Sequence, residues 1–208
     1  MDEWNDLYSG FELASHTVYH PPIDRSPLPL VAQEILEDRK AIEAVVGYPV
    51  RGFAYPFGSY TPEILSLLPS LGIRYGRVVG DSDNFSMPED FYKWKATCHH
   101  NHRLYENAEA FLAINNDFRL NLMYVWGHSY EFTTYDNWDL IERFASLVSR
   151  RDDIWYATNI EIVDYMDASK RLVFSADNSI VSNPSALDIW LSVDGATVVV
   201  PGGKTINI

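Results

Sequence analysis

The sequence predicts an α/β fold that is followed by a small all-β tail. Short apolar segments with a period of two alternate with amphipathic helical segments from residue 11 to about residue 168, and from Arg171 onward only strand patterns remain. Repeated strand-helix-strand order is typical of parallel βαβ units in a sheet or barrel. A chain of 208 residues can hold one domain with a sizeable core and a small appendage.

The first half of the α/β region has clear start and stop signals. Period-two patterns predict strands at 11–15, 50–55 and 73–79. Between them we expect an amphipathic helix at 30–46, which ends at a glycine, and a helix at 61–71, which opens with a threonine cap and a proline.

The later elements follow from the same patterns. We expect extended chain at 91–97, strands at 120–126 and 154–157, and helices at 107–115, 137–150 and 160–168. The tail is expected to hold strands at 172–174, 186–193 and 197–200, with Asp194-Gly195 as a hairpin turn.

Composition excludes several classes of protein. A net charge of -13 argues against binding to nucleic acid or to anionic membranes, which requires clusters of Lys and Arg. Cys98 is the only cysteine, so no internal disulfide forms. No apolar run is long enough to span a membrane, and the acidic start is unlike a signal peptide. We therefore expect a cytoplasmic chain as given, with secretion left open if the natural chain starts earlier.

Two histidines follow the first predicted strand. His16 and His20 are four positions apart and are followed by Pro21-Pro22. If 17–20 form one helical turn, both imidazoles lie on one side and can share a metal ion at ~2.1 Å. The alternative is a chance pair.

Two further motifs stand at strand ends. Arg51 to Gly58 supplies a guanidinium that can hold a carboxylate and a Pro-x-Gly turn that can aim the Phe57 N–H at an oxyanion; the alternative is a strand with a turn. His128 follows the strand at 120–126, where α/β folds keep reactive groups, and the alternative is a core histidine.

A second polar cluster contains Cys98, His99, His100 and His102. Such a cluster can be a zinc site or a nucleophile with its base. Adjacent histidines on extended chain point to opposite faces, which favours pocket lining over metal binding. Side chains that could contact sugar are Trp94, Trp126, Tyr130 and Glu131, although each aromatic residue could serve packing alone.

In this order the motifs resemble those of the polysaccharide deacetylases, the carbohydrate esterase family with the NodB-like domain. His16-Thr17-Val18-Tyr19-His20 resembles H-[ST]-x-x-H, and Arg51 to Gly58 resembles R-x-P-x-G with the arginine two residues further from the proline. The stretch Val125 to Phe132 resembles the late leucine and histidine motif. The resemblance implies an incomplete (β/α)7-type NodB-like barrel over 1–170, a β extension at 171–208, and metal-dependent removal of N- or O-acetyl groups from carbohydrate.

The resemblance also implies roles for single residues. His16 and His20 would bind a divalent metal, zinc first, with cobalt, manganese or nickel as alternatives. His128 would be the general acid, Arg51 would orient a carboxylate, and the Phe57 N–H would face the oxyanion. The substrate-binding residues would be Tyr55, Pro56, Trp126, Tyr130 and Glu131.

The chain departs from the family in one motif. The aspartate pair T-F-D-D-G, which supplies a third metal ligand and the base, is missing upstream of His16. We therefore expect weak or no activity, from a fragment, a late start or a non-catalytic relative that binds carbohydrate as a scaffold; a weaker alternative is another metal-dependent amidohydrolase. A missing strand would leave open barrel edges that a second copy could cover. The replacement carboxylates that the sequence offers are Asp24, Asp81, Asp83 and Glu131.

Overall fold

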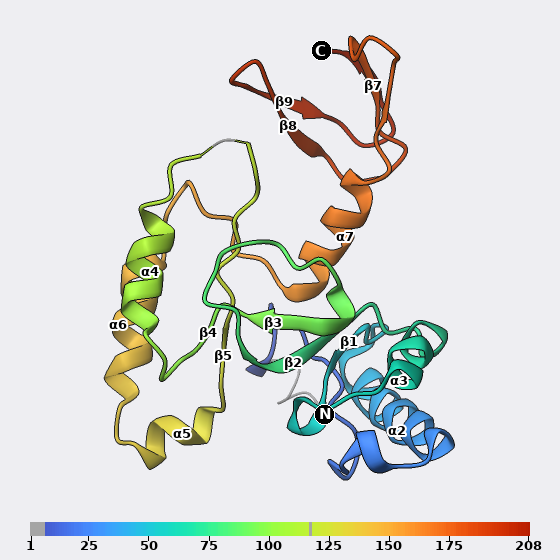
Figure 1. Ribbon diagram of the computed structural model, residues 1–208, viewed down its shortest axis with the longest axis vertical. Helices are drawn as coiled ribbons and strands as arrows, with labels where there is room; N and C mark the ends of the chain where they lie inside the picture. The colour runs from blue at the N-terminus through green and yellow to red at the C-terminus, as the bar shows by residue number, and fades with distance from the viewer. Residues whose placement is uncertain (1–6, 117) are drawn as a thin grey trace. The chain divides into compact units, whose positions relative to one another are not determined.

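The computed structural model describes residues 7–116 and 118–208, so the first six residues of the predicted domain at 1–170 lie outside the described residues. The chain divides into two compact units (Figure 1): residues 1–115 with 120–156, and residues 116–119 with 157–208. Helix α7 (Asn159–Ser169) belongs to the second unit, whereas the sequence places the boundary at residue 170. That boundary stays a prediction.

The strands of the first unit are parallel. β1 (Gly52–Ala54), β2 (Tyr75–Asp81) and β3 (Trp94–Ala96) form one sheet in the order β1-β2-β3. β4 (Cys98–His99) pairs with β5 (Val125–Trp126). Ser15 makes an isolated parallel bridge to Phe53, which extends the sheet on the β1 side. The prediction of an α/β fold is confirmed.

Helices surround these strands. The α-helices of the first unit are α2 (Leu28–Val46), α3 (Pro62–Leu67), α4 (Leu104–Leu112), α5 (Ser129–Thr134) and α6 (Trp138–Val148). The 3-10 helices are η1 (Ile23–Arg25), η2 (Pro56–Gly58), η3 (Leu68–Leu71) and η4 (Phe91–Lys93). As expected from the sequence, α2 ends at Gly47 in the left-handed conformation, and the Thr61 hydroxyl caps α3 by accepting from the Ile64 N–H.

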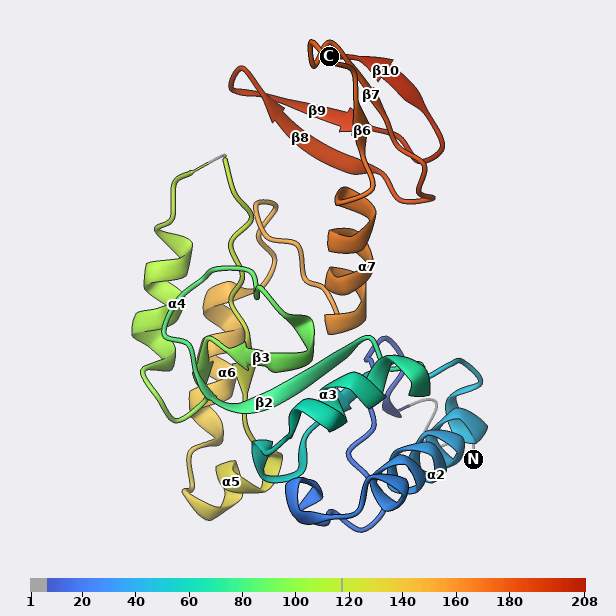
Figure 2. The ribbon, with the colours of Figure 1, turned by 45° about the vertical axis from the view of Figure 1, so that its right-hand side comes forward.

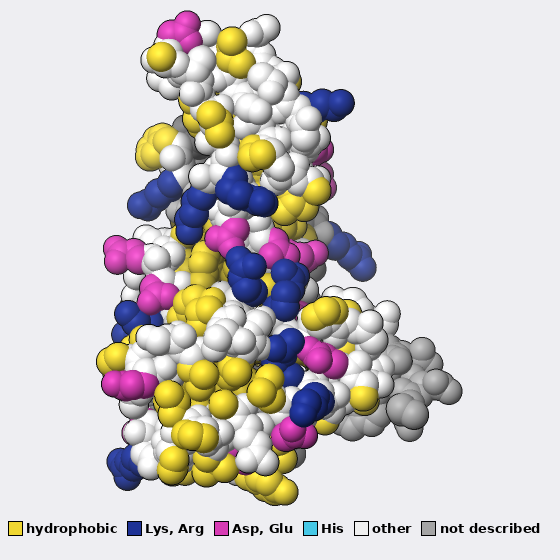
Figure 3. All heavy atoms as spheres, turned by 90° about the vertical axis from the view of Figure 1, so that its right-hand side faces the viewer, with side chains coloured by type: hydrophobic (Ala, Val, Ile, Leu, Met, Phe, Trp, Pro, Cys, Tyr) yellow, Lys and Arg dark blue, Asp and Glu magenta, His cyan; other side chains and the backbone are white. Residues whose placement is uncertain are grey.

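The core of this unit lies where α2, α3 and η3 pack against β1 and β2. Its buried members are Ile23, Val31, Ile35, Phe53, Tyr55, Ile64, Leu68, Ile73 and Val78. Hydrophobic side chains also gather on the face drawn in Figure 3, over the part of this unit that bears α2 and α3. A shallow groove of about 440 Å³ between these helices is lined by Leu28, Pro62, Glu63, Ser66, Leu67 and Ser70.

Three predicted strands are shorter than expected or absent. In the strand predicted at 11–15, only Ser15 makes a β-bridge. The strand predicted at 120–126 is reduced to β5, and no strand forms at 154–157. The chain before β5 is nevertheless tied down, because the Tyr124 carbonyl accepts from the Thr97 and Cys98 N–H groups. These bonds hold extended chain without the regular register that defines a strand.

The second unit consists of α7 (Asn159–Ser169) and two antiparallel sheets, which Figure 2 shows clearly. The strands are β6 (Val173–Phe174), β7 (Ile180–Ser182), β8 (Ile189–Val193), β9 (Ala196–Val200) and β10 (Thr205–Asn207). They pair as β10-β7-β6 and as the hairpin β8-β9. The predicted hairpin turn is present, with Asp194 and Gly195 both at positive φ as a type I′ turn requires. None of the helices in the described part of the chain has the length and apolarity that crossing a bilayer needs.

Candidate metal and substrate site

His16 is anchored where two parallel strands end. The bridge between Ser15 and Phe53 sets it beside the carboxyl end of β1, where its Nδ1 lies 2.7 Å from the Ala54 carbonyl oxygen. Asp38 of α2 accepts from the His16 N–H at 2.8 Å and from the Ser15 hydroxyl at 2.7 Å. Helix α2 therefore fixes the main chain of His16, and β1 fixes its ring.

The loop from Thr17 to His20 brings the two histidines together by a route other than the expected helical turn. Thr17 and His20 have left-handed φ values of 69° and 53°. The His20 N–H donates to the Thr17 hydroxyl, and the Tyr19 N–H donates to the Glu34 carboxylate on α2. These side-chain hydrogen bonds replace those of a helical turn. The His16 and His20 rings still meet edge to face, with ring centres 4.7 Å apart.

The environment of His16 suits a metal ligand. Burial lowers its pKa, the Ala54 carbonyl opposes that effect, and the nearby His20 adds to it, so that the neutral ring dominates at neutral pH. Because a carbonyl only accepts, the Nδ1 atom carries the proton, and the lone pair of Nε2 is left for a metal or a substrate group.

Residues from the loop after β1 divide between this site and the core. Phe57 has a left-handed φ of 57°, is 65% exposed and packs its ring edge on His20 at 4.5 Å. Tyr55 and Pro56 are buried, and the Tyr55 hydroxyl donates to the Tyr92 carbonyl. Tyr55 is therefore a core residue, and burial raises the pKa of its hydroxyl.

Arg51 stands just before the amino end of β1. The Ala54 carbonyl that holds His16 lies at the other, carboxyl end of this strand. The place of Arg51 near the histidines is taken by Arg77 of β2, whose Cα is paired with that of Ala54. The positive charge of Arg77 contributes to the lowered pKa of His16, and its guanidinium lies 5.1 Å from the centre of the Trp126 ring. Its Nη1 is buried and has no hydrogen-bond partner among residues 7–116 and 118–208. Sequence reasoning missed Arg77, although an arginine inside the apolar pattern of β2 was a usable signal.

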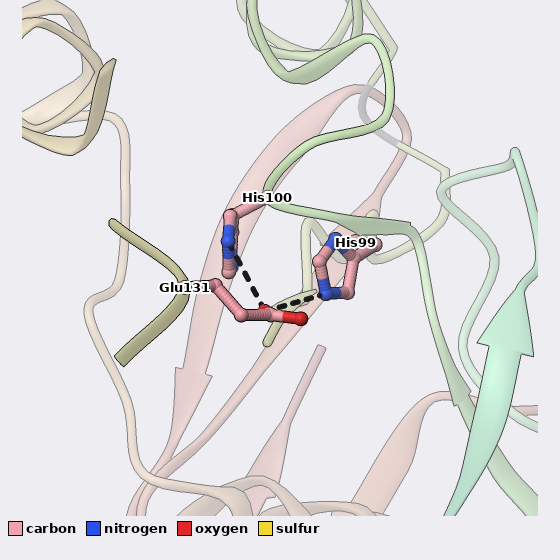
Figure 4. A group of neighbouring side chains, drawn as sticks. All are labelled: His99, His100 and Glu131. Atoms are coloured by element: carbon pink, nitrogen blue, oxygen red, sulfur yellow. Dashed lines mark ion pairs between the residues drawn. The ribbon is translucent and has the colours of Figure 1, made fainter. Parts of the chain in front are cut away.

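A second group of ionisable side chains lies between β4 and α5 (Figure 4). One carboxylate oxygen of Glu131, Oε2, lies 3.1 Å from His99 Nε2 and 3.3 Å from His100 Nε2. Both rings face Glu131 because β4 ends at His99 and the chain turns there. The expectation that adjacent histidines point apart holds only for extended chain, and this segment is not extended beyond His99.

His128 stands next to this group, at the start of α5. Its N–H donates to Glu131 Oε2 at 3.0 Å, and its Nδ1 lies 3.5 Å from the same oxygen. The ring is about half exposed and stacks on Tyr130 at 5.1 Å. Trp126 donates its indole N–H to Asp81 at 2.8 Å. The structure thus brings together the four predicted residues Trp126, His128, Tyr130 and Glu131.

Other predicted candidates have different surroundings. Cys98 is buried, and burial raises the pKa of its thiol to about 11, which makes it a poor nucleophile. His102 pairs with Asp83 at 3.1 Å, away from Glu131. Trp94 is buried in the core. Asp24 accepts from the Ser59 hydroxyl.

The carboxylates that the sequence offered as replacement metal ligands therefore contact other residues and not His16 or His20. They are Asp24, Asp81, Asp83 and Glu131. Within the described ranges, a single set of three or more His, Cys, Asp or Glu has ligand atoms all within 4.8 Å of one another: His99, His100 and Glu131. No third ligand joins His16 and His20 in that part of the chain.

Residues 4–76 match the polysaccharide deacetylase family. This segment of the chain is therefore similar to the polysaccharide deacetylases. This segment includes His16, His20 and Phe57, and the match confirms the resemblance indicated by the motifs. His128 and Glu131 lie beyond it. No curated protein sequence matches the chain.

Three solved structures are similar to parts of this chain. The Streptococcus pyogenes deacetylase PplD in complex with acetate is 21% identical over 35% of this chain and 32% of its own, with a TM-score of 0.34. The polysaccharide deacetylase candidate BA0330 of Bacillus anthracis is 21% identical over 41% of this chain and 27% of its own, with a TM-score of 0.34. The 4-alpha-glucanotransferase of Thermococcus litoralis is 15% identical over 76% of this chain and 31% of its own, with a TM-score of 0.49. The chain spans about a third of the length of these proteins.

Proposed function

We propose that the chain carries a hydrolase site of the deacetylase type, centred on His16 and His20, which acts on acetylated carbohydrate. The observation that carries this proposal is the meeting of the two imidazoles at 4.7 Å, beside the exposed ring of Phe57, within the segment that matches the deacetylase family. The site lies at the carboxyl ends of neighbouring parallel strands, where α/β folds place their reactive groups.

The two imidazoles fit a divalent metal in part. The Nε2 atom of His16 is available, His20 is exposed beside it, and neither has a carboxylate as third ligand in the described residues. Zinc, or cobalt, manganese or nickel instead, would polarise the acyl carbonyl and lower the pKa of a bound water. Two protein ligands imply weaker binding than three, which keeps the expectation of low activity.

The protein's own groups have separate tasks in this proposal. The Phe57 N–H, on the loop that leaves β1, would donate to the oxyanion. Arg77 takes the orienting role that the sequence assigned to Arg51, because its guanidinium lies on the Trp126 ring and its charge acts on His16. The main-chain N–H of His128 donates a hydrogen bond to Glu131, which holds the residue in place. The His128 side chain would protonate the leaving amine or alcohol. The exposed ring of Tyr130 offers a stacking surface for a sugar.

A second candidate function is carbohydrate binding without turnover. The lack of a third ligand beside His16 and His20 in the part of the chain described here favours it, because water would then have no base. The exposed aromatic rings would still bind a sugar ring in this case.

The finer architecture belongs to the same proposal. Neighbouring strands pair in sequence order from Ser15 through β1, β2 and β3, as successive strands of a NodB-like barrel would. We extend this to an incomplete (β/α)7-type barrel over 1–170, with a β extension at 171–208 and a second copy covering open strand edges. Light scattering on the purified chain would test for the second copy.

Acetate release from acetylated chito- and xylo-oligosaccharides tests the proposed function, with binding of the same sugars measured by calorimetry. We expect slow release that needs added zinc and is lost in the double variant His16→Ala, His20→Ala. His102→Ala is the matched control, because this exposed histidine pairs with Asp83. Sugar binding without release would support the binding function, and release that survives in the double variant would refute the site.

A further inference from the structure

The cluster of His99, His100 and Glu131 has the residue types of a metal site, and it is separate from His16 and His20. We propose that His99, His100 and Glu131 bind one divalent first-row metal ion, with Zn²⁺ as the reference ion. Two imidazoles and one carboxylate are a common set of protein ligands for zinc. The proposal does not depend on the deacetylase function.

The spacing of the ligand atoms fits a shared ion. Two atoms that each lie ~2.0–2.1 Å from one tetrahedral zinc are ~3.3–3.4 Å apart. The two separations from Glu131 Oε2 are 3.1 Å to His99 Nε2 and 3.3 Å to His100 Nε2. No two of the three ligand atoms are more than 4.8 Å apart. His99 and Glu131 keep 19% and 18% of their side chains exposed, so solvent reaches the fourth position.

His100 supplies the second, independent observation. Its side chain is only 3% exposed, and its Nε2 has no hydrogen-bond partner among the described residues, although Glu131 lies close by. Buried polar nitrogens are nearly always satisfied, so an orphan of this kind points to a missing partner. Figure 4 shows this nitrogen directed at the carboxylate. A bound cation would satisfy it.

The surroundings hold the His100 ring in that orientation. The ring stacks on Phe132 with ring centres 4.3 Å apart, and its Nδ1 edge lies against Gly127, where an added Cβ atom would come within 1.8 Å of Nδ1. Glu131 is likewise fixed, because it accepts from the His128 N–H at the start of α5. Two of the three ligands are thus positioned before any ion arrives, which reduces the entropy lost on binding.

His99 has to make one adjustment. The Asn101 N–H lies 3.1 Å from His99 Nδ1 and donates to it, which places the ring proton on Nε2. Coordination through Nε2 moves that proton to Nδ1 and breaks this single hydrogen bond, in a turn where Asn101 is exposed. Binding should therefore be accompanied by a local change around Asn101.

Zinc titration of the full chain without an affinity tag tests the proposal. The background is the double variant His16→Ala, His20→Ala, which removes the other candidate ligands and keeps this test independent of the proposed function. Calorimetry should give one equivalent of Zn²⁺. We expect the affinity to fall at least 100-fold on His99→Ala and on Glu131→Gln, and to change less than 3-fold on His102→Ala.

Nitrogen-15 spectra of the imidazoles provide a readout that needs no further substitution. Zinc should shift the resonances of His99 and His100 and the main-chain signal of Asn101, while the His102 ring stays unchanged. The proposal is overturned if the double variant binds no zinc, if zinc shifts only other histidines, or if Glu131→Gln binds as tightly as its parent.

Discussion

Replacing Gly127 with alanine tests the packing that holds His100 in place. Gly127 has a φ of 156°, and an added Cβ would lie 1.8 Å from His100 Nδ1 and 2.3 Å from its Cε1. Phe132 stacks on the same ring, with the ring centres 4.3 Å apart, and restricts its movement. The substitution therefore combines backbone strain with a steric clash.

The two contributions can be estimated separately. A conformation that side chains rarely adopt costs about 1–3 kcal/mol. Overpacking of a filled site costs about another 1–3 kcal/mol. Gly127→Ala should thus lower the free energy of unfolding by about 2–6 kcal/mol. Gly80→Ala is the matched control, because its φ is 109° and nothing lies within 4 Å of the added Cβ, so that only the strain applies.

Urea unfolding followed by tryptophan fluorescence measures these losses, since Trp94, Trp126, Trp138 and Trp155 belong to the first unit. A double-mutant cycle with His100→Ala isolates the clash, because the cost of Gly127→Ala should drop by about 1–3 kcal/mol once the ring is gone. Equal losses for Gly127→Ala and Gly80→Ala, together with no coupling to His100, would refute the reasoning.

Three further predictions concern the second unit. Thr158→Ala should destabilise it by about 1 kcal/mol, since the Thr158 hydroxyl and the Glu161 side chain cap α7 reciprocally, and Thr158→Ser should keep most of that stability; thermal unfolding by circular dichroism checks both. Asn183→Ala should cost at least about 2 kcal/mol, because the buried amide donates to two main-chain carbonyls and accepts from Ser185, and unmade buried hydrogen bonds cost about 1–3 kcal/mol each; urea unfolding would show no loss if water replaced these bonds. Hydrogen bonds from two serine hydroxyls and a main-chain N–H lower the pKa of Asp177 from 3.8 to about 2. The stability that Asp177 adds relative to Asp177→Asn should be complete above pH 3.8 and vanish as the pH falls through about 2, and a difference that is constant with pH would contradict this.

Local patterns in the sequence predicted much of the fold. Helix α2, strand β2 and the hairpin β8-β9 were expected because each has a sustained period and a turn residue that ends it. Strands β7 and β10 were missed, because three residues with exposed neighbours carry no periodic signal.

The candidate site was predictable in its residue types and less so in its groupings. The rings of His16 and His20 lie together, but through left-handed residues and a contact to Glu34 that depend on tertiary structure. The grouping of Glu131 with His99 and His100 depends on α5 meeting β4, and no spacing along the chain encodes that contact. The one local signal was the glutamate three residues after His128, a pattern of helix starts that sequence reasoning did not use.

The pairing of strands in chain order has a consequence for how the first unit folds. Ser15 pairs with β1, β1 with β2, and β2 with β3, so each new pairing closes only the connection between two successive strand segments. The entropy cost of loop closure is then divided over several short loops and is not concentrated in one long-range contact. Folding should proceed by addition of neighbouring steps, and the ring of His16 can reach the Ala54 carbonyl only after β1 has docked against Ser15.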